Sequence, residues 1–600
     1  MPGLKPSFLG RGVPLYPAVA TAAAYAANSR AVAAPMLPAP PEMTATLSWS
    51  LAMGPPGLDR SRLRTMPGGE PRGQAATVRD ATLDVLRELG LTTIFSNPGS
   101  TEVSFLTGLP DDLRFVLGLH EGSVVGMASG FAIGRGAPAF VLLHTTAGLG
   151  NAVSALATAR VNRAPLVVVV GQQDRRHLAL EPFLAGRLQG LAGEYPVWVN
   201  QPVRAQDVPG TLVRAYHEAL SGRGPAVVVV PMDDWLARAP AAHEIFGPQR
   251  VLRSRTVQPE AIDELAALLE ESESPAIVAG AGADTPDGWT ALVALAERLG
   301  CPVWQEAFGA RASFPQDHPL FAGYLPPGRA RLRDALNAHD TIVAVGAPIF
   351  RQYAYEPGPL VRLGTRLVLV TDDPAEAHRS PSEITVLADP AAVCRGLAER
   401  LDPRPVSSRP LRARPEPPPP GEPLTAGQVF AALADRLPPE AIVLEESPSN
   451  RPELNARLVV RQSLGLLSAA MGGLGFAVPG AIGLRMALPE RPVLAVVGDG
   501  ASLYAIQALW SAARYGVGAL FVVMANGRYA IMDQLAANTG KPGPWPDFEG
   551  IDIAAIARAF GCPATRVDTH DELVSQLDEV IPTLGARDQP LLLEIAIAAS

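Results

Sequence analysis

Long uninterrupted apolar runs recur along the chain, and they limit the possible folds more than any other feature. PLVVVVG (165–171) and GPAVVVVP (224–231) carry no side chain that prefers water, so both faces of such strands must be covered. Amphipathic stretches such as ATLDVLRELG (81–90) and NAVSALATARVN (151–162) alternate with these runs and predict helices. The alternation predicts an α/β fold made of doubly wound parallel sheets.

The alternation occurs in three blocks that are separated by changes in composition. We expect a disordered extension at 1–75, sheet domains at 76–254, 255–403 and 424–600, and a Pro-rich linker at 404–423. The extension is rich in Ala and Pro, and two alternatives stay open for it. Translation could begin at Met66, or the Ala-rich run behind Lys5 and Arg11 could be a secretion signal.

Charge and cysteine content exclude several classes of partner. The chain has 50 basic and 59 acidic residues, a net charge of −9, which argues against nucleic acid. Its apolar runs all fall short of the roughly 18–20 residues of a membrane span, so we expect no membrane partner. Cys301, Cys394 and Cys562 lie too far apart for a disulfide framework or a metal motif, which fits a cytoplasmic location.

The segment that begins VLAVVGDG carries the strongest chemical signal. One predicted strand ends at GDG (498–500) and the next ends at Asn526, and parallel strands end at the same edge of a sheet. Asp499 and Asn526 offer hard oxygen ligands for Mg²⁺, and the glycines let backbone N–H groups approach a phosphate. A helix expected from Ser502 to beyond Trp510 would point its positive end there. The unit predicts a Mg²⁺–diphosphate site; a simple turn with an Asp cap is the alternative.

GDG followed after 25 residues by Asn resembles the thiamine diphosphate motif. Together with the three-domain order, the chain resembles the thiamine-dependent 2-oxo acid decarboxylase and acetolactate synthase superfamily. The resemblance implies thiamine diphosphate and Mg²⁺ as cofactors, with Asp499, Asn526 and the carbonyl of Arg528 on the metal. Ala525 departs from the tandem asparagines usual in the family. Further implied cofactor contacts are Ser449, Gly472, Leu474, Gly498, Gly500, Ala501, Ser502 and Tyr529, with Leu474 as the apolar support that bends the cofactor.

The same resemblance assigns the activating carboxyl to Glu121, in LHEGSVVGMASGFA. Thiamine reacts after loss of its C2 proton, and a carboxyl on the aminopyrimidine promotes the tautomer that takes this proton. A shared proton needs a buried, apolar site, and Val124, Val125 and Met127 suit this requirement. A solvated helix glutamate is the structural alternative.

FSNPGSTEVSFL, LLHTTAGLGNAVSAL and FPQDHPLFAG are similar to segments of the benzoylformate decarboxylase branch, and the likeness covers nearly all of 76–598. It implies that Ser100, His144 and His318 join Glu121 in catalysis. Ser100 would bind a substrate carboxylate, although a helix N-cap is its structural alternative. The histidines would transfer protons. We therefore expect a carbon–carbon lyase that converts a 2-oxo acid to an aldehyde and CO₂ without oxidation.

The expected substrate pocket departs from this branch. Ser468 and Leu535 stand where ring-contacting phenylalanines are usual, and Ile531 replaces a small residue, so an aliphatic or differently substituted 2-oxo acid is possible. Two other functions stay open, a carboligase like acetolactate synthase or benzaldehyde lyase, and a cofactor-binding scaffold without catalysis.

The family also implies assembly, because its sites form between two chains. We expect a homodimer or homotetramer. No segment calls for the FAD that some relatives bind in the middle domain, although the sequence does not exclude it. The loop GAGADTPDG there is weak evidence for a nucleotide, and such a loop is more often a simple strand-to-helix turn.

Overall fold

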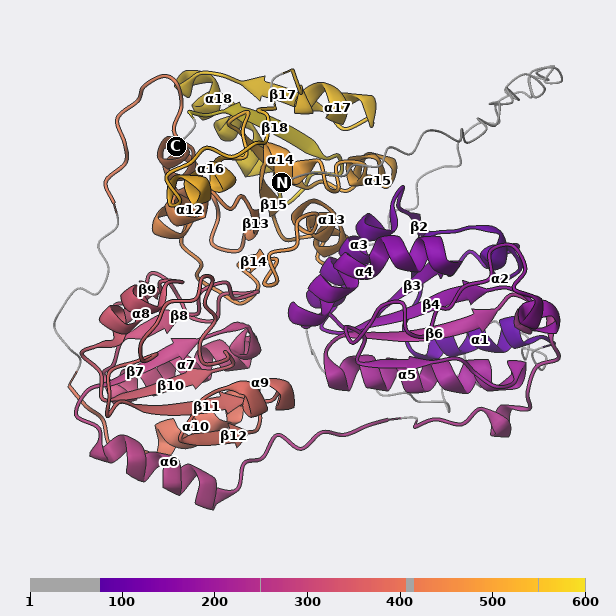
Figure 1. Ribbon diagram of the computed structural model, residues 1–600, viewed down its shortest axis with the longest axis horizontal. Helices are drawn as coiled ribbons and strands as arrows, with labels where there is room; N and C mark the ends of the chain where they lie inside the picture. The colour runs from indigo at the N-terminus through magenta and orange to yellow at the C-terminus, as the bar shows by residue number, and fades with distance from the viewer. Residues whose placement is uncertain (1–75, 249, 406–414, 549, 599–600) are drawn as a thin grey trace, which may run out of the picture. The chain divides into compact units, whose positions relative to one another are not determined.

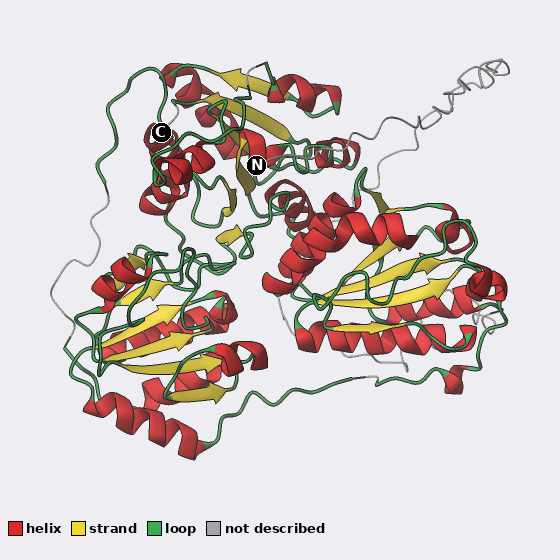
Figure 2. Ribbon diagram, viewed as in Figure 1, coloured by secondary structure: helices red, strands yellow, loops and turns green. Residues whose placement is uncertain are grey.

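The computed structural model describes residues 76–248, 250–405, 415–548 and 550–598. These residues form three six-stranded parallel sheets with helices packed against them, which confirms the expected α/β fold (Figures 1 and 2). We call the parts that carry the sheets the first, middle and third domains. The expected extension at 1–75 and residues 406–414 of the expected linker lie outside the described residues. In the described ranges, helices are too short or too polar to span a bilayer.

The first domain places its central strands where both faces are covered by helices. Its sheet has the order β2-β1-β3-β4-β6-β5, and Val167–Val170 at its centre are fully buried, as their uniform apolar character predicts. In Figure 1, α3 and α4 cover one face and α1 and α5 the other. The elements are α1 (Val78–Glu88), β1 (Thr93–Asn97), α2 (Val103–Leu106), β2 (Arg114–Leu117), α3 (Glu121–Arg135), β3 (Ala139–His144), α4 (Thr145–Val161), β4 (Leu166–Gln172), β5 (Trp198–Asn200), α5 (Val208–Gly222) and β6 (Pro225–Pro231).

The middle domain has a different strand order, β12-β11-β10-β7-β8-β9. Its elements are α6 (Pro259–Glu271), β7 (Pro275–Ala279), α7 (Pro286–Leu299), β8 (Val303–Gln305), β9 (Phe321–Tyr324), α8 (Arg329–Leu336), β10 (Thr341–Val345), β11 (Arg366–Thr371), α9 (Pro374–Arg379), β12 (Ile384–Leu387) and α10 (Pro390–Arg400).

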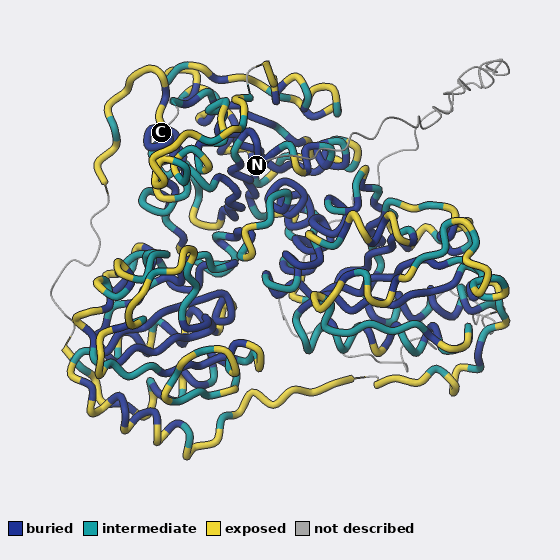
Figure 3. Tube along the Cα trace, in the orientation of Figure 1, coloured by how far each residue is buried: buried dark blue, intermediate teal, exposed yellow. Residues whose placement is uncertain are grey.

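The third domain repeats the topology of the first, with the order β14-β13-β15-β16-β18-β17. Its elements are α11 (Ala426–Ala434), β13 (Ile442–Glu446), α12 (Arg451–Arg457), β14 (Leu466–Ser468), α13 (Ala477–Ala487), β15 (Val493–Gly498), α14 (Asp499–Ser502), α15 (Ala508–Arg514), β16 (Leu520–Ala525), α16 (Ala530–Ala537), α17 (Ile553–Ala559), β17 (Ala564–Val567), α18 (His570–Val580) and β18 (Leu591–Ala596). Figure 3 shows the central strands as the buried interior of each domain.

One helix prediction was wrong. The expected continuous helix from Ser502 to beyond Trp510 is two pieces, α14 and α15. Hydrogen bonds of i to i+3 type replace the α-helical pattern between them, because Ala505 donates to Ser502 and Ala508 donates to Ala505. The helical turn at the GDG motif therefore begins at Asp499 itself.

Helices α3 and α13 join the first domain to the third through glycine contacts. A Cβ at Gly483 would lie 1.8 Å from the carbonyl oxygen of Met127, and one at Gly130 would lie 2.0 Å from that of Gly480. Only glycine lets the two backbones approach so closely. The contact fixes the direction of α3, whose first residue is Glu121.

Candidate active site

Glu121 begins α3 and lies against the end of the first-domain sheet. Its side chain is nearly covered, and the residue is 7% exposed. Asn97 donates to Oε1 at 3.2 Å and Asn151 donates to Oε2 at 3.0 Å. The three apolar residues expected around it are fully buried. The carboxyl is therefore buried as expected, but its direct partners are amides, which fix the orientation of both oxygens.

His144 ends β3, and a buried carboxylate lies behind its ring. His144 Nδ1 lies 3.0 Å from Oε2 of Glu102 and 3.0 Å from Oγ1 of Thr101. Glu102 is 1% exposed and also accepts hydrogen bonds from Gly99 N, at 2.8 Å, and from the Thr101 hydroxyl. A carboxylate that accepts from Nδ1 selects the tautomer whose Nε2 can take or give a proton.

Glycines bring the polar side chains of this edge together. A Cβ at Gly148 would lie 3.5 Å from His144 Cβ and 3.6 Å from Glu121 Oε1, so both side chains pack against the same turn of α4. A Cβ at Gly99 would lie 2.4 Å from the His144 ring, which explains glycine before Ser100. Ser100 itself is exposed and begins a 3₁₀ turn whose N-cap is Gly99, so the N-cap alternative for Ser100 is wrong.

His318 lies in the middle domain, apart from this cluster. Its Nε2 is 3.3 Å from Oε1 of Glu297, its Nδ1 accepts from Leu320 N, and its ring packs edge-on against Phe314. The loop before it contacts the third domain, where Asp317 pairs with Arg461. Within one chain the contacts of His318 therefore do not join it to His144.

Asp499 and Asn526 meet at the carboxyl ends of β15 and β16. Asp499 Oδ1 accepts from Gly500 N at 2.8 Å, and Oδ2 accepts from Gly527 N at 2.7 Å, so the carboxylate bridges the two strand ends. Asn526 Oδ1 accepts from Arg528 N at 3.1 Å. Burial raises the pKa of Asp499, and the hydrogen bonds from Gly500 and Gly527 offset part of this rise.

The third-domain residues fit the expected cofactor group. One carboxylate with amide and carbonyl oxygens is a donor set for Mg²⁺. Such a set differs from a cluster of three or more His, Cys, Asp or Glu side chains, which does not occur in the described ranges. A cavity of about 190 Å³ borders Asp499, Gly527 and Phe548. A Cβ at Gly500 would lie 2.6 Å from the Phe548 ring. Glycine avoids this clash and leaves the backbone beside the cavity accessible.

The other expected cofactor and pocket residues lie on loops and helices of the same domain. Gly472 has φ +74°, and Leu474 is half-buried just before α13. Ile531 and Leu535 lie one turn apart on α16. Ser468 instead donates its hydroxyl to the carbonyl of Gly309 in the middle domain. Of the remaining expected contacts, Gly498 ends β15, and the others lie in the loops or the short helix after β13, β15 and β16: Ser449, Ala501, Ser502 and Tyr529.

The two groups of residues form two half-sites on different domains. The hydrogen bonds of Glu121 stay in the first domain, and those of Asp499 stay in the third. Sequence reasoning missed Glu102, Asn97 and Asn151, which orient the first half-site. Their signal was their place near predicted site residues: Asn97 ends β1, Glu102 lies in the 3₁₀ turn after Gly99, and Asn151 lies in the second turn of α4.

The fold is that of a thiamine diphosphate enzyme, and the chain belongs to that family. Models of the thiamine pyrophosphate enzyme N-terminal, central and C-terminal domains match residues 76–192, 262–397 and 456–595. The family membership and the branch expected from the sequence are confirmed by the individual relatives.

The chain is 40% identical to benzoylformate decarboxylase of Pseudomonas aeruginosa over 526 residues, which cover 86% of this chain and 98% of that protein. The solved thiamine diphosphate-dependent 4-hydroxybenzoylformate decarboxylase of Rhodococcus jostii superposes with a TM-score of 0.84 at 37% identity, covering 88% and 100% of the two chains. Acetolactate synthase of Arthrospira platensis is 24% identical, with coverage of 86% and 93%. The expected enzyme class, a carbon–carbon lyase, agrees with the two decarboxylases.

Proposed function

We propose that the protein is a thiamine diphosphate- and Mg²⁺-dependent decarboxylase that converts a 2-oxo acid to an aldehyde and CO₂ without oxidation. The observation that carries this proposal is the first half-site, in which Glu121 and His144 pack against one turn of α4 beside Ser100. A buried carboxylate, Glu102, supports the histidine. Release of an aldehyde requires a proton donor, because a carbon must receive a proton after CO₂ leaves, and in this proposal His144 is that donor.

Each half-site has its own task. When bound, thiamine diphosphate supplies the reactive carbon and accepts the electron pair released with CO₂. Asp499, Asn526 and the Arg528 carbonyl hold the metal, and Leu474 supports the cofactor from its apolar side. Glu121, fixed by two amides, holds a proton at the aminopyrimidine.

Substrate handling falls to the first half-site. The exposed hydroxyl of Ser100 binds the substrate carboxylate. His144 delivers a proton from Nε2 and later removes the hydroxyl proton, while Glu102 keeps the ring in one orientation.

The separate hydrogen bonds of Glu121 and Asp499 support a proposal on assembly. We propose a homodimer or homotetramer in which the first domain of one chain faces the third domain of another. His318 would then act in a site to which a second chain contributes. We also predict a cytoplasmic location, which the three buried, unpaired cysteines suit.

A substrate panel tests this function. The purified protein, supplied with thiamine diphosphate and Mg²⁺, is offered pyruvate, branched-chain 2-oxo acids and benzoylformate, and CO₂ and aldehyde are measured. We expect aldehyde from at least one acid. Ser468, Ile531 and Leu535 reshape the pocket, so the preferred side chain need not be phenyl. Acetolactate as the main product would show a carboligase, and cofactor binding by calorimetry without turnover of any acid would show a scaffold.

A further inference from the structure

The middle-domain sheet has the topology of a dinucleotide-binding domain. Read from its other edge, its strand order is β9-β8-β7-β10-β11-β12. The first three strands are added toward one edge and the last three toward the other, so the direction in which strands are added reverses between β7 and β10. In such sheets a nucleotide lies in the crevice at this reversal, with its phosphates over a glycine turn after the first strand and an acidic residue near the ribose. The crevice of this domain is therefore the place to ask whether a nucleotide fits.

The glycine turn and the acidic residue are both present. Gly280 and Gly282 follow β7, and the N–H of Gly282 donates to the carbonyl of Gly346, just after β10, at 2.8 Å. Glu306 follows β8 and is 3% exposed. By backbone geometry alone, the domain would be a nucleotide site.

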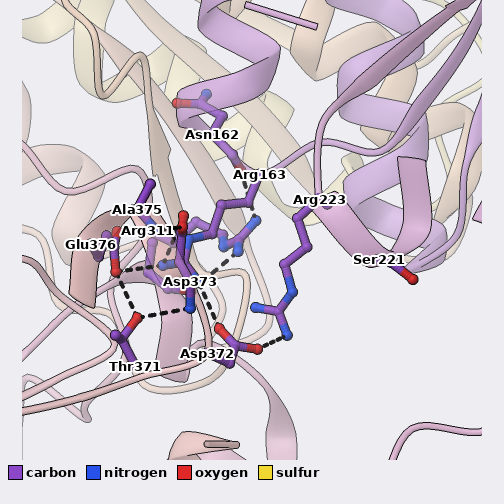
Figure 4. Close-up of polar contacts among 12 residues, drawn as sticks. Asn162, Arg163, Ser221, Arg223, Arg311, Thr371, Asp372, Asp373, Ala375 and Glu376 are labelled. Carbon is purple, nitrogen blue, oxygen red and sulfur yellow. Dashed lines mark hydrogen bonds and ion pairs between the residues drawn. The ribbon is translucent and has the colours of Figure 1, made fainter. Parts of the chain in front are cut away.

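The crevice is filled by an arginine from the first domain. Arg163 Nη1 lies 2.8 Å from the position of a Cβ on Gly282, directly over the glycine turn. The guanidinium pairs with Asp372 at 3.1 Å and with Glu376 at 2.7 Å, both just after β11 (Figure 4). The Arg163 side chain is only 4% exposed, so little space for a phosphate remains there.

The ribose side of the crevice is closed as well. Glu306 Oε2 lies 2.8 Å from the position of a Cβ on Gly280, and Oε1 lies 2.9 Å from Arg351 Nε. The carboxylate that would accept from a ribose hydroxyl is thus already paired within the domain.

Hydrogen bonds from the third and middle domains fix the backbone around Arg163. Asn162 donates from its amide to the carbonyl of Ser468 and accepts from Ala470 N, both at 3.0 Å, in the third domain. Arg311 donates to the carbonyls of Asn162 and Ala281, at 3.3 and 3.2 Å, in the first and middle domains. Arg163 itself has φ +58°, a conformation rare for a residue with a side chain. The side chain is therefore placed by its surroundings rather than by local preference.

Charge supports the same placement. Burial lowers the pKa of Arg163, but the attraction of Glu376 and Asp372 outweighs it, and the pKa is raised. The acidic residues after β11 thus select a cation, whereas a nucleotide phosphate is an anion.

We propose that Arg163 is a built-in plug of the middle-domain crevice. Its guanidinium takes the space of a nucleotide phosphate, so the middle domain binds the first domain here instead of a flavin or adenine nucleotide.

Two measurements on the full chain test whether Arg163 occupies the place of a nucleotide in the crevice. First, FAD and ADP are titrated into the wild-type protein by calorimetry, and we expect no binding up to about 1 mM. Second, Arg163→Ala removes the guanidinium, and we expect a lower thermal midpoint that about 10 mM methylguanidinium restores by more than half, because the ligand refills the cavity.

Arg223→Ala is the matched control. Arg223 pairs with the same Asp372, yet it makes no contact with the glycine turn among the contacts of the described residues. We expect methylguanidinium to leave the midpoints of this variant and of the wild type unchanged. The proposal is overturned if the wild type binds FAD or ADP, or if methylguanidinium acts equally on both variants. The wild-type titration needs no variant, so binding of FAD or ADP there would overturn the proposal even if Arg163→Ala does not fold.

Discussion

At the scale of single residues, the first half-site depends on side chains that orient other side chains. Glu102 orients His144, and Asn97 and Asn151 orient Glu121. Glu102 is buried, Asn97 is half-buried and Asn151 is exposed, and the loss of any of them leaves a partner without its hydrogen bond. Such residues affect a reaction without touching the substrate.

Glu102→Gln tests the support of His144. The amide keeps the shape but can no longer accept from Nδ1 as a carboxylate does, so we expect kcat to fall about 10- to 100-fold. Steady-state kinetics on the substrate found in the panel measure the effect, and the KM for thiamine diphosphate should stay unchanged. Full activity in this variant would exclude a role for Glu102.

Glu121→Gln tests the cofactor-activating carboxyl. We expect a loss of activity of about 10²- to 10⁴-fold, because the amide cannot share the required proton. Exchange of the C2 proton of bound thiamine diphosphate, followed by NMR, measures the step directly. Glu218→Gln, on a solvent-facing ion pair with Arg214, is the matched control and should behave as the wild type. Retention of more than about a tenth of the activity would contradict the role.

Glu306 gives a prediction on pH. Burial raises its pKa to about 7, above the roughly 4.3 of an unfolded glutamate. A raised carboxyl pKa means that the folded state binds the proton more tightly, so the contribution of Glu306 to stability is full at low pH and is lost between about pH 4.3 and 7. The stabilisation of the wild type relative to Glu306→Gln, measured as the difference between their thermal midpoints, should therefore decrease as pH rises from about 5 to 8.

Glu383 supplies a control of opposite sign. The hydrogen bond from Arg366 lowers the pKa of this half-exposed carboxyl, so its smaller contribution is present at neutral pH and is lost in acid. The midpoint difference for Glu383→Gln should thus shrink as pH falls. Equal pH slopes for both variants would contradict the assignment of Glu306.

At the scale of elements, burial decided which strands could be predicted. The strands predicted from continuous apolar runs, such as β4 and β6, are interior strands of their sheets. The six edge strands, β2, β5, β9, β12, β14 and β17, were missed. An edge strand such as β5, whose residues are all half-buried, has neither a full apolar run nor a clear alternation. The expected helix after GDG failed for another reason, since i to i+3 bonding divides it.

The contact between α3 and α13 leads to a prediction at this scale. Gly483→Ala would place a methyl group 1.8 Å from the Met127 carbonyl, so the helices must separate. We expect a loss of about 1–3 kcal/mol in unfolding free energy, measured as a lower thermal midpoint. Gly150→Ala is the control, because its Cβ would meet no atom within 4 Å and alanine favours the helix by up to about 1 kcal/mol. Equal midpoints for the two variants would contradict the close contact.

At the scale of the whole molecule, the question is how the two half-sites meet. Helices α3 and α13 bind the first and third domains of one chain together by their glycine faces, whereas the polar half-sites form no hydrogen bond to each other among those described for Glu121 and Asp499. A second chain can supply the missing half, as the proposed assembly requires.

Mixed oligomers test this assembly. Glu121→Gln and Asp499→Ala should each be inactive alone. If each site combines Glu121 of one chain with Asp499 of another, a hybrid dimer contains one intact site of two. About half of the wild-type activity should therefore return in the hybrid dimers, and about a quarter in a random mixture of which they make up half. The two chains are co-expressed with different tags, and the doubly tagged species is assayed. Inactive hybrids would show that each site forms within a single chain.

The sequence by itself determined the α/β class with three sheet domains, the GDG–Asn element and the family, because apolar runs and short spacings are local properties. The tertiary structure decided which side chains meet. Glu102 reaches His144, and Arg163 reaches Asp372 and Glu376, across long stretches of chain. Such contacts depend on where the folded strands end, and no periodicity in the sequence records them.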